Sequence, residues 1–176
     1  MILSGMRCNM KKNNYQKGTT LIELLLYLAI ASGIMLSLVT FAWDVIGGGA
    51  KSARQEDVSS SVRYLSSRIG YEIRNANSIN SVSSSSISLA DSVPANNPTV
   101  FSLSGNNLTI KEGSAAAVNL NPNSVKVTSL AFSNYSSSGN ETQHIMYTLT
   151  VQSSYPSKGN IFETDSMESS VEVRSH

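Results

Sequence analysis

The sequence predicts an α+β protein, in which the second half of a long N-terminal helix packs on a mostly antiparallel β-sheet. Two observations predict this class. Residues 19–79 combine an almost uncharged apolar stretch with an amphipathic stretch of helical spacing. The remaining residues form short alternating segments separated by Gly, Pro and Asn. With 176 residues, the chain has room for one modest core and an appendage.

Charge is distributed unevenly along the chain. Residues 1–18 contain four of the 13 basic residues and no acid, so nine basic and 12 acidic residues follow, a net charge of −3. A body without a basic run has no electrostatic footprint for phosphate backbones, so we expect no nucleic acid partner. The single cysteine, Cys8, allows no intrachain disulfide. The four basic residues are Arg7, Lys11, Lys12 and Lys17.

The apolar stretch from Thr19 to Trp43 has the length and composition of a membrane-spanning helix. Its 25 residues contain one charged side chain, Glu23. A helix of that length extends about 37 Å, more than the hydrocarbon core of about 30 Å. Because the basic residues precede it, the positive-inside rule places the N-terminus in the cytoplasm and the remainder outside. We therefore expect a single-pass protein of the plasma (inner) membrane with an extracytoplasmic head.

Two other interpretations of this stretch remain open. A secretory signal peptide would find a small-x-small cleavage pattern at Ala29-Ile30-Ala31, although the apolar run continues to Trp43 and a carboxylate inside such a region is costly. A plain signal anchor would account for the hydrophobicity and leave Glu23 unexplained. Glu23 is therefore the residue that distinguishes the interpretations.

Three consecutive glycines, Gly47 to Gly49, interrupt the helical pattern, and we expect a flexible joint or a break there. Helical periodicity then resumes in an amphipathic segment, residues 47–79, which should pack on the sheet. We expect Arg63, Arg68 and Arg74 to lie on its solvated face, with Glu72 beside Arg68. The apolar stripe consists of Val58, Val62, Leu65, Ile69, Ile73 and Ala76.

Residues 80–176 change to the period of β-strands and should form a β-rich head. The sequence around Gly105-Asn106 predicts a hairpin that joins Leu103 to Leu108. Serine-rich stretches at residues 83–86 and 136–138 should be loops. The predicted strands are residues 86–89, 99–103, 107–110, 125–127, 145–151 and 171–173.

The residues Lys17-Gly18-Thr19-Thr20-Leu21-Ile22-Glu23-Leu24-Leu25 resemble the processing site of type IV pilins and pseudopilins. In that family, a prepilin peptidase cuts after the glycine and methylates the new amino terminus. The resemblance implies that residues 1–18 are a leader, that Gly18 is its last residue, and that Thr19 becomes the methylated N-terminus. The family usually has Phe where this chain has Thr19, a departure that bears more on methylation than on cleavage. Residues 19–46 would be the transmembrane and assembly helix.

Glu23 has a physical argument of its own. A carboxylate at membrane depth costs about 2.5–3.5 kcal/mol on insertion scales, so it tends to be paired and functional. Cleavage after Gly18 creates an α-amino group at Thr19, and in the family the glutamate meets such a group on a neighbouring subunit. A simpler role is compatible with this one: Glu23 complements the dipole at the helix N-terminus. Small residues every four positions favour close helix packing on one face, formed by Ala29, Gly33 and Ser37.

A second, more diffuse resemblance concerns the member of the family. Residues 62–79, with Glu72-Ile73-Arg74-Asn75-Ala76 at their centre, look like the helix end of J-type minor pseudopilins and W-type minor pilins, and Val171 to Arg174 resemble their closing strand. This implies a minor subunit of a type IV pilus, type II secretion or DNA-uptake fibre. The implied partners are other pilin or pseudopilin subunits, the prepilin peptidase, the inner-membrane assembly platform and membrane lipid.

We expect no enzymatic activity, cofactor or metal. His144 and His176 are the only histidines, too few for a multi-histidine metal cluster. Glu163, Asp165 and Glu168 form one acidic cluster; calcium binding is conceivable there, but we expect a solvated edge or turn. Two other functions stay open: an adhesin or DNA-binding pilin on the same scaffold, and a membrane-anchored enzyme.

Overall fold

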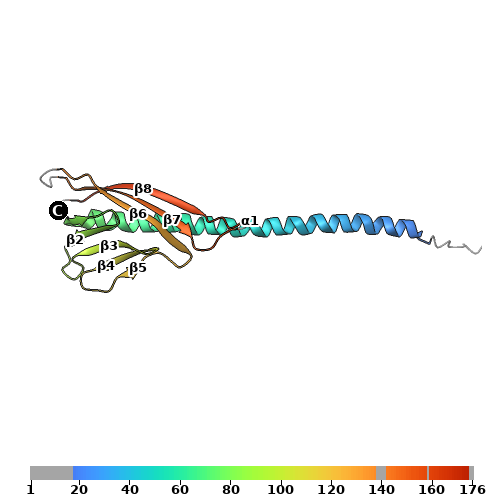
Figure 1. The fold of residues 1–176 in the computed structure, drawn as a ribbon, viewed down its shortest axis with the longest axis horizontal. Coiled ribbons are helices and arrows are strands. Elements are labelled where there is room, and N and C mark those ends of the chain that lie inside the picture. Colours follow the sequence, from blue (N-terminus) through green and yellow to red (C-terminus); the bar gives the residue numbers. More distant parts are fainter. Residues whose placement is uncertain (1–17, 138–141, 158, 175–176) are drawn as a thin grey trace, which may run out of the picture. The chain divides into compact units, whose positions relative to one another are not determined.

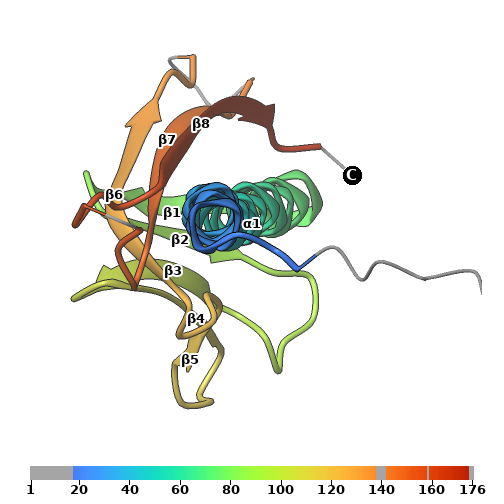
Figure 2. The same ribbon diagram turned by 90° about the vertical axis from the view of Figure 1, so that its right-hand side faces the viewer.

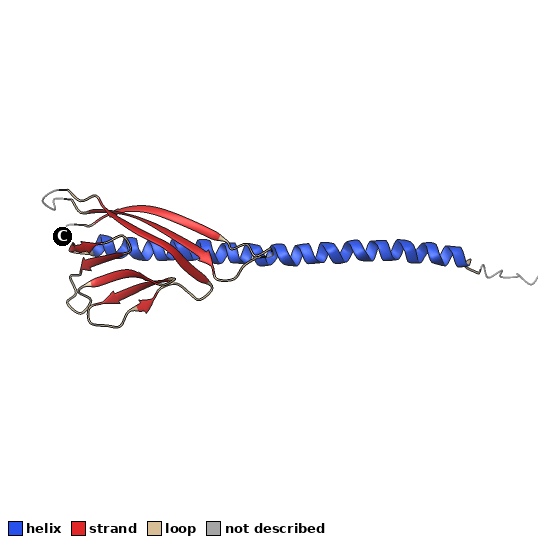
Figure 3. Cartoon of the chain, viewed as in Figure 1, coloured by secondary structure: helices blue, strands red, loops and turns tan. Residues whose placement is uncertain are grey.

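The computed structural model describes residues 18–137, 142–157 and 159–174, and shows one long helix followed by eight β-strands (Figures 1 and 3). The helix, α1, spans Leu21–Asn75. The strands form two antiparallel sheets that pack on its second half. The predicted α+β class is therefore confirmed. Most of the leader expected at residues 1–18 lies outside the described residues.

The described chain divides into two compact units, up to Asp44 and from Val45 onward. The expectation that α1 breaks at Gly47 to Gly49 is wrong, because all three glycines are helical. An added Cβ would meet no atom within 4 Å at any of them, so no close contact requires glycine there. The helix ends at Asn75, four residues before the boundary expected at residue 79, because residues 78 and 79 already belong to a strand.

The first sheet is a five-stranded meander in the order β1-β2-β3-β4-β5. The predicted hairpin is confirmed: β3 and β4 pair through Leu103 and Leu108, and Gly105 has the positive φ of 61° that the tight turn requires. β1 and β5 were not expected, because neither has a run of alternating apolar residues. The strands are β1 Ser78–Val82, β2 Ser86–Ala90, β3 Thr99–Ser104, β4 Asn107–Glu112 and β5 Val118–Asn119.

The second sheet has three longer strands in the order β6-β7-β8 and curves around α1 (Figure 2). The predicted segments covered only the start of β6 and the end of β8, because the other residues of both strands include many serines and acids and few apolar residues. In β7, buried and partly buried residues alternate along the whole strand, as expected for a sheet with one face on the core. The bounds are β6 Val125–Asn134, β7 His144–Ser153 and β8 Thr164–Glu172.

The core of the second unit lies between α1 and the inner faces of both sheets. The predicted stripe is confirmed, since Val58, Leu65, Ile69 and Ile73 are all 0% exposed. The buried Tyr147 of β7 fixes the helix to the sheet: its hydroxyl donates to the carbonyl of Ser66 at 2.7 Å and lies 2.9 Å from the Ser66 hydroxyl. Two hydrogen bonds from one buried phenol set the position of α1 against β7.

Arg68 departs from the solvated face expected for the arginines. Its guanidinium pairs with Glu72 at 2.8 Å, as the four-residue spacing predicts, and also with Glu112 of β4 at 3.2 Å. Arg63 and Arg74 are exposed, as expected. Burial raises the pKa of Glu72; Arg68 acts in the opposite direction, while Glu112 and Asp91 add to the rise. Arg68 therefore connects the helix to the first sheet through a shared carboxylate pair.

Candidate functional site

The predicted processing junction lies directly before α1. Gly18, Thr19 and Thr20 are outside regular structure and exposed, and the helix begins at Leu21. Thr20 caps it: the main-chain N–H of Glu23 donates to the Thr20 hydroxyl at 3.3 Å, and the N–H of Leu24 donates to the Thr20 carbonyl at 3.2 Å. The peptide bond after Gly18 is thus two residues from a capped helix, in an accessible segment.

Glu23 occupies the third helical position, where a carboxylate faces the positive end of the helix dipole. The simpler of the two expected roles of Glu23 therefore fits its position. Its Oε1 accepts a hydrogen bond from the Tyr27 hydroxyl at 3.2 Å, one turn along the helix. Among the described residues, Glu23 has no salt-bridge partner. The carboxylate therefore retains the capacity to accept a cation.

The surface around Glu23 is apolar on every side of the helix. Leu21 and Ile22 are 78% and 74% exposed, and the apolar side chains that follow, as far as Ile46, are also exposed. An 18-residue window here has a mean hydropathy of 2.2, with none of it buried inside the structure. By length and composition, this segment is able to cross a membrane. A signal sequence passes the same test, so that alternative stays open.

The hydroxyl groups of this apolar segment are satisfied within the helix. Ser32 donates to the carbonyl of Ala29 at 2.9 Å, and Ser37 donates to that of Ile34 at 2.8 Å. Thr40 shares its proton between the carbonyls of Leu36 and Ser37. Such bonds spare hydroxyl groups the desolvation cost that they would otherwise meet in a hydrocarbon environment.

The three residues of the predicted packing face are exposed, and their packing against another helix stays a prediction. Ala29, Gly33 and Ser37 follow one another at intervals of about one turn, and an added Cβ at Gly33 would meet no atom within 4 Å. Gly33 therefore fills no role in the packing of the described chain itself.

The acidic cluster of the head differs from its prediction. Glu163 is buried, 8% exposed, and accepts a hydrogen bond from the Ser157 hydroxyl at 3.0 Å. The expectation of a solvated edge was wrong for Glu163, because its side chain is buried and hydrogen-bonded to Ser157. Asp165 accepts a hydrogen bond from Ser59 of α1 at 2.9 Å, and Glu168 is exposed. Within the described residues, no three His, Cys, Asp or Glu side chains are grouped to hold a metal ion.

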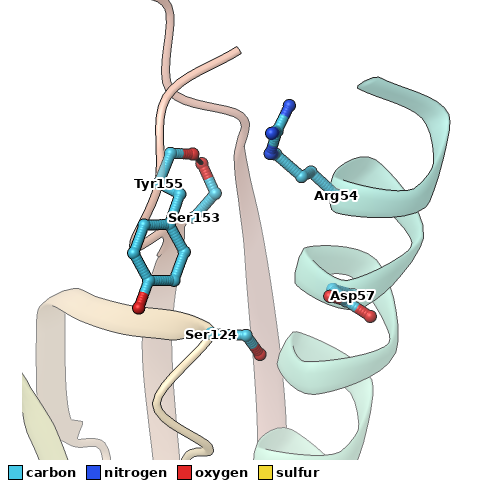
Figure 4. A pocket seen from close by; sticks show the side chains of 5 residues that line it. All are labelled: Arg54, Asp57, Ser124, Ser153 and Tyr155. Carbon is cyan, nitrogen blue, oxygen red and sulfur yellow. Dashed lines mark hydrogen bonds between the residues drawn. The ribbon is translucent and has the colours of Figure 1, made fainter. Parts of the chain in front are cut away.

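A small cavity lies near this cluster, between α1 and the ends of β6 and β7 (Figure 4). Arg54 and Asp57 line it from the helix, and Ser124, Ser153 and Tyr155 line it from the sheet side. Its volume of about 40 Å³ is that of one or two water molecules. The cavity is too small for an organic substrate.

No family model, curated protein or solved structure matches the chain. The residues at the start of α1 are therefore the candidate functional site of the described chain. Sequence reasoning identified Gly18, Thr19 and Glu23 but missed the contributions of Thr20 and Tyr27. Both had a signal: Thr20-Leu21-Ile22-Glu23 has the spacing of a capping box, and Tyr27 is four residues after Glu23.

Proposed function

We propose that the chain is a minor pilin-like subunit, cut between Gly18 and Thr19 and assembled into a fibre through α1. The observation that carries the proposal is the position of Glu23, an accessible carboxylate without an ionic partner among the described residues, on a helix whose surroundings are otherwise apolar. In a membrane, such a group is costly unless a cation pairs with it. Cleavage supplies that cation as the α-amino group of Thr19 on a neighbouring subunit.

Two further features support this proposal. The large apolar side chains from Leu21 to Ile46 are exposed in the described chain, so they need lipid before assembly and other helices afterwards. The stripe of Ala29, Gly33 and Ser37 gives a face on which a second helix approaches closely. The role is structural rather than catalytic, and the apolar part of α1 anchors the subunit in the plasma (inner) membrane until it joins the fibre.

N-terminal sequencing of the chain from membrane fractions tests the processing step. We expect a chain that begins at Thr19. Gly18→Val should block the cut, and an added Cβ at this position meets no atom within 4 Å, so a folding defect is not expected. A chain that keeps Met1, or a Gly18→Val chain that is still cut, would contradict the proposed processing.

Fibre shearing tests the assembly step. A Glu23→Ala subunit should be processed normally and be reduced at least about tenfold in the sheared fraction, because an ionic contact in an apolar setting is lost. Glu56→Ala is a matched control, since Glu56 is an exposed acid on the same helix outside the apolar segment. Equal amounts of the two variants in the sheared fraction would contradict the assembly role of Glu23, and a function left intact by Glu23→Ala would favour a membrane-anchored enzyme. Mass spectrometry of the N-terminal peptide of the processed chain reports whether Thr19 is methylated.

A further inference from the structure

The four sheet edges of the head differ in how they are protected. β5 has only two residues, and β1 has an irregular register between Ile79 and Ser81. The main chain of β6 bonds outside its own sheet: Val127 donates to the carbonyl of Asn106 at 2.9 Å, and Phe132 donates to that of Ser84 at 3.1 Å. β8 is nine residues long, pairs without a bulge, and contains neither Pro nor Lys. Edges of that kind template pairing with another strand.

The register shows which groups of β8 are free. Ser153 donates to the carbonyl of Glu163 at 2.8 Å, and Val173 donates to that of Gln143 at 2.9 Å. Because the pairing between these two bonds is regular, odd-numbered residues of β8 bond to β7 and even-numbered residues face away. The N–H of Ser166 is taken up by the Asp165 carboxylate at 2.9 Å. The open edge therefore centres on the residues that follow, Glu168 and Ser170.

A groove of about 240 Å³ lies beside this edge, between β8 and α1. Met167 and Ser169 line it from β8, while Arg63, Gly70 and Arg74 line it from the helix. The second sheet curves around α1 and stops at β8 (Figure 2). One more strand would continue that curve and cover the groove.

The charged side chains beside the edge of β8 indicate which kind of strand would bind there. Arg63 and Arg74 lie 11 residues apart, so they project from nearly the same side of α1 and are separated by about 16 Å along its axis. Neither has a salt-bridge partner among the described residues, whereas Arg68 has two. Met167 and Ser169 face the groove, so the alternating Glu168 and Glu172 project from the opposite face of the sheet. An added strand thus meets guanidinium groups on its inner face and carboxylates on its outer face.

We propose that the edge of β8 binds an extended segment of a partner protein as a further strand, with acidic side chains directed into the groove toward Arg63 and Arg74. Main-chain hydrogen bonds to Glu168 and Ser170 supply affinity, and the two arginines select acidic residues. This site is independent of the proposed function, because it uses no residue of the N-terminal segment and needs no cleavage.

Fluorescence anisotropy with the full chain in neutral detergent tests the site. The probe is a blocked nine-residue peptide of alternating glutamate and threonine. We expect it to bind more tightly than about 1 mM, with an affinity that falls as salt is added. The matched peptide of lysine and threonine should bind at least tenfold more weakly. No binding by the acidic peptide, or equal binding by the basic one, would overturn the proposal.

Substitutions at Glu168 and at the two arginines distinguish main-chain pairing at the strand edge from attraction by charge. Glu168→Pro removes a main-chain N–H that faces away from β7, so it should weaken the peptide at least tenfold, while Glu168→Gln should not weaken it. The double change Arg63→Gln and Arg74→Gln should remove the salt dependence. If Glu168→Pro fails to fold, a peptide N-methylated along one edge tests the same bonds on the ligand. Full binding of that peptide, or displacement of the probe by a DNA duplex as efficient as by unlabelled acidic peptide, would overturn the inference.

Discussion

The two parts of α1 differ both in apolar content and in the environment of their apolar side chains. In the part before Val45, Leu28 is 59% exposed and Ile22 is 74% exposed. In the part within the second unit, Val58 and Leu65 are completely buried under the two sheets. The second part is amphipathic, so burying one stripe leaves polar side chains to meet water. The first part is apolar all round, and no single sheet covers such a surface.

This difference shows where each part of the helix obtains its stability. Burial within the chain stabilises the second part, at about 25 cal/mol per Å² of apolar surface. The first part gains nothing comparable from the described chain, so its apolar surface must be removed from water by lipid or by other chains.

Truncating one leucine in each part should separate them most clearly. Leu65→Ala should lower the free energy of unfolding by about 2–5 kcal/mol, because it opens a cavity in a packed core. Leu28→Ala should change it by no more than about 0.5 kcal/mol, since its side chain is 59% exposed. Calorimetric unfolding of the chain in detergent measures both. Equal losses would mean that the first part is also packed within the chain.

The glycines near the boundary between the units should lower the local stability of the helix. Changing Gly47, Gly48 and Gly49 together to Ala should stabilise the helix locally by about 0.5–1 kcal/mol per residue, because there is space for each added Cβ. Amide hydrogen exchange from Gly47 to Arg54 should slow by about tenfold or more. Gly33→Ala is the control, a similar change that should leave exchange at residues 47–54 as it was. Unchanged exchange in the triple variant would show that the glycines do not weaken α1.

The hydroxyl of Tyr147 should account for part of the attachment of α1 to the sheet. Tyr147→Phe removes two hydrogen bonds to Ser66 and leaves a buried hydroxyl without its partner, at a cost of about 1–2 kcal/mol. Tyr64→Phe, on the exposed side of the same helix, should cost almost nothing. Unfolding temperatures of the two variants measure the difference. Equal unfolding temperatures would show that the Tyr147 hydroxyl does not stabilise the attachment of α1 to the sheet.

The smallest effect concerns pH. Burial raises the pKa of Glu72 in the folded state, so the folded protein holds that proton more tightly than the unfolded chain does. Its contribution to stability is complete below the ordinary value of 4.5 and is lost as pH rises through the raised pKa. Glu72→Gln should therefore flatten the fall in unfolding temperature above about pH 4.5.

Glu112→Gln should reduce the same slope, because Glu112 is one of the charges that raise the pKa of Glu72. Both variants remove a contact to Arg68 and so change the unfolding temperature at every pH. The informative quantity is therefore the change of unfolding temperature with pH. If the slope of Glu72→Gln equals that of the unchanged chain, Glu72 is not the group that titrates.

Local patterns were sufficient to predict the elements with strong periodicity. The stripe from Val58 to Ala76 follows from helical spacing, and the hairpin at Gly105-Asn106 follows from turn chemistry. The stripe was predicted correctly because burial of one helix face fixes the spacing of apolar residues. The cleavage at Gly18 and the pairing of Glu23 stay predictions, since they depend on other proteins.

The sequence by itself determined the order of the parts: an apolar helix with one carboxylate, an amphipathic helix and a β-rich head. Only the tertiary structure decided what depends on contacts distant in the chain. α1 continues through Gly47 to Gly49 although glycine disfavours a helix, because intrinsic propensity is weak compared with context. Arg68 reaches Glu112 across 44 residues, and the edge of β8 lies open beside Arg63 and Arg74. These arrangements arise from packing, which local periodicity does not encode.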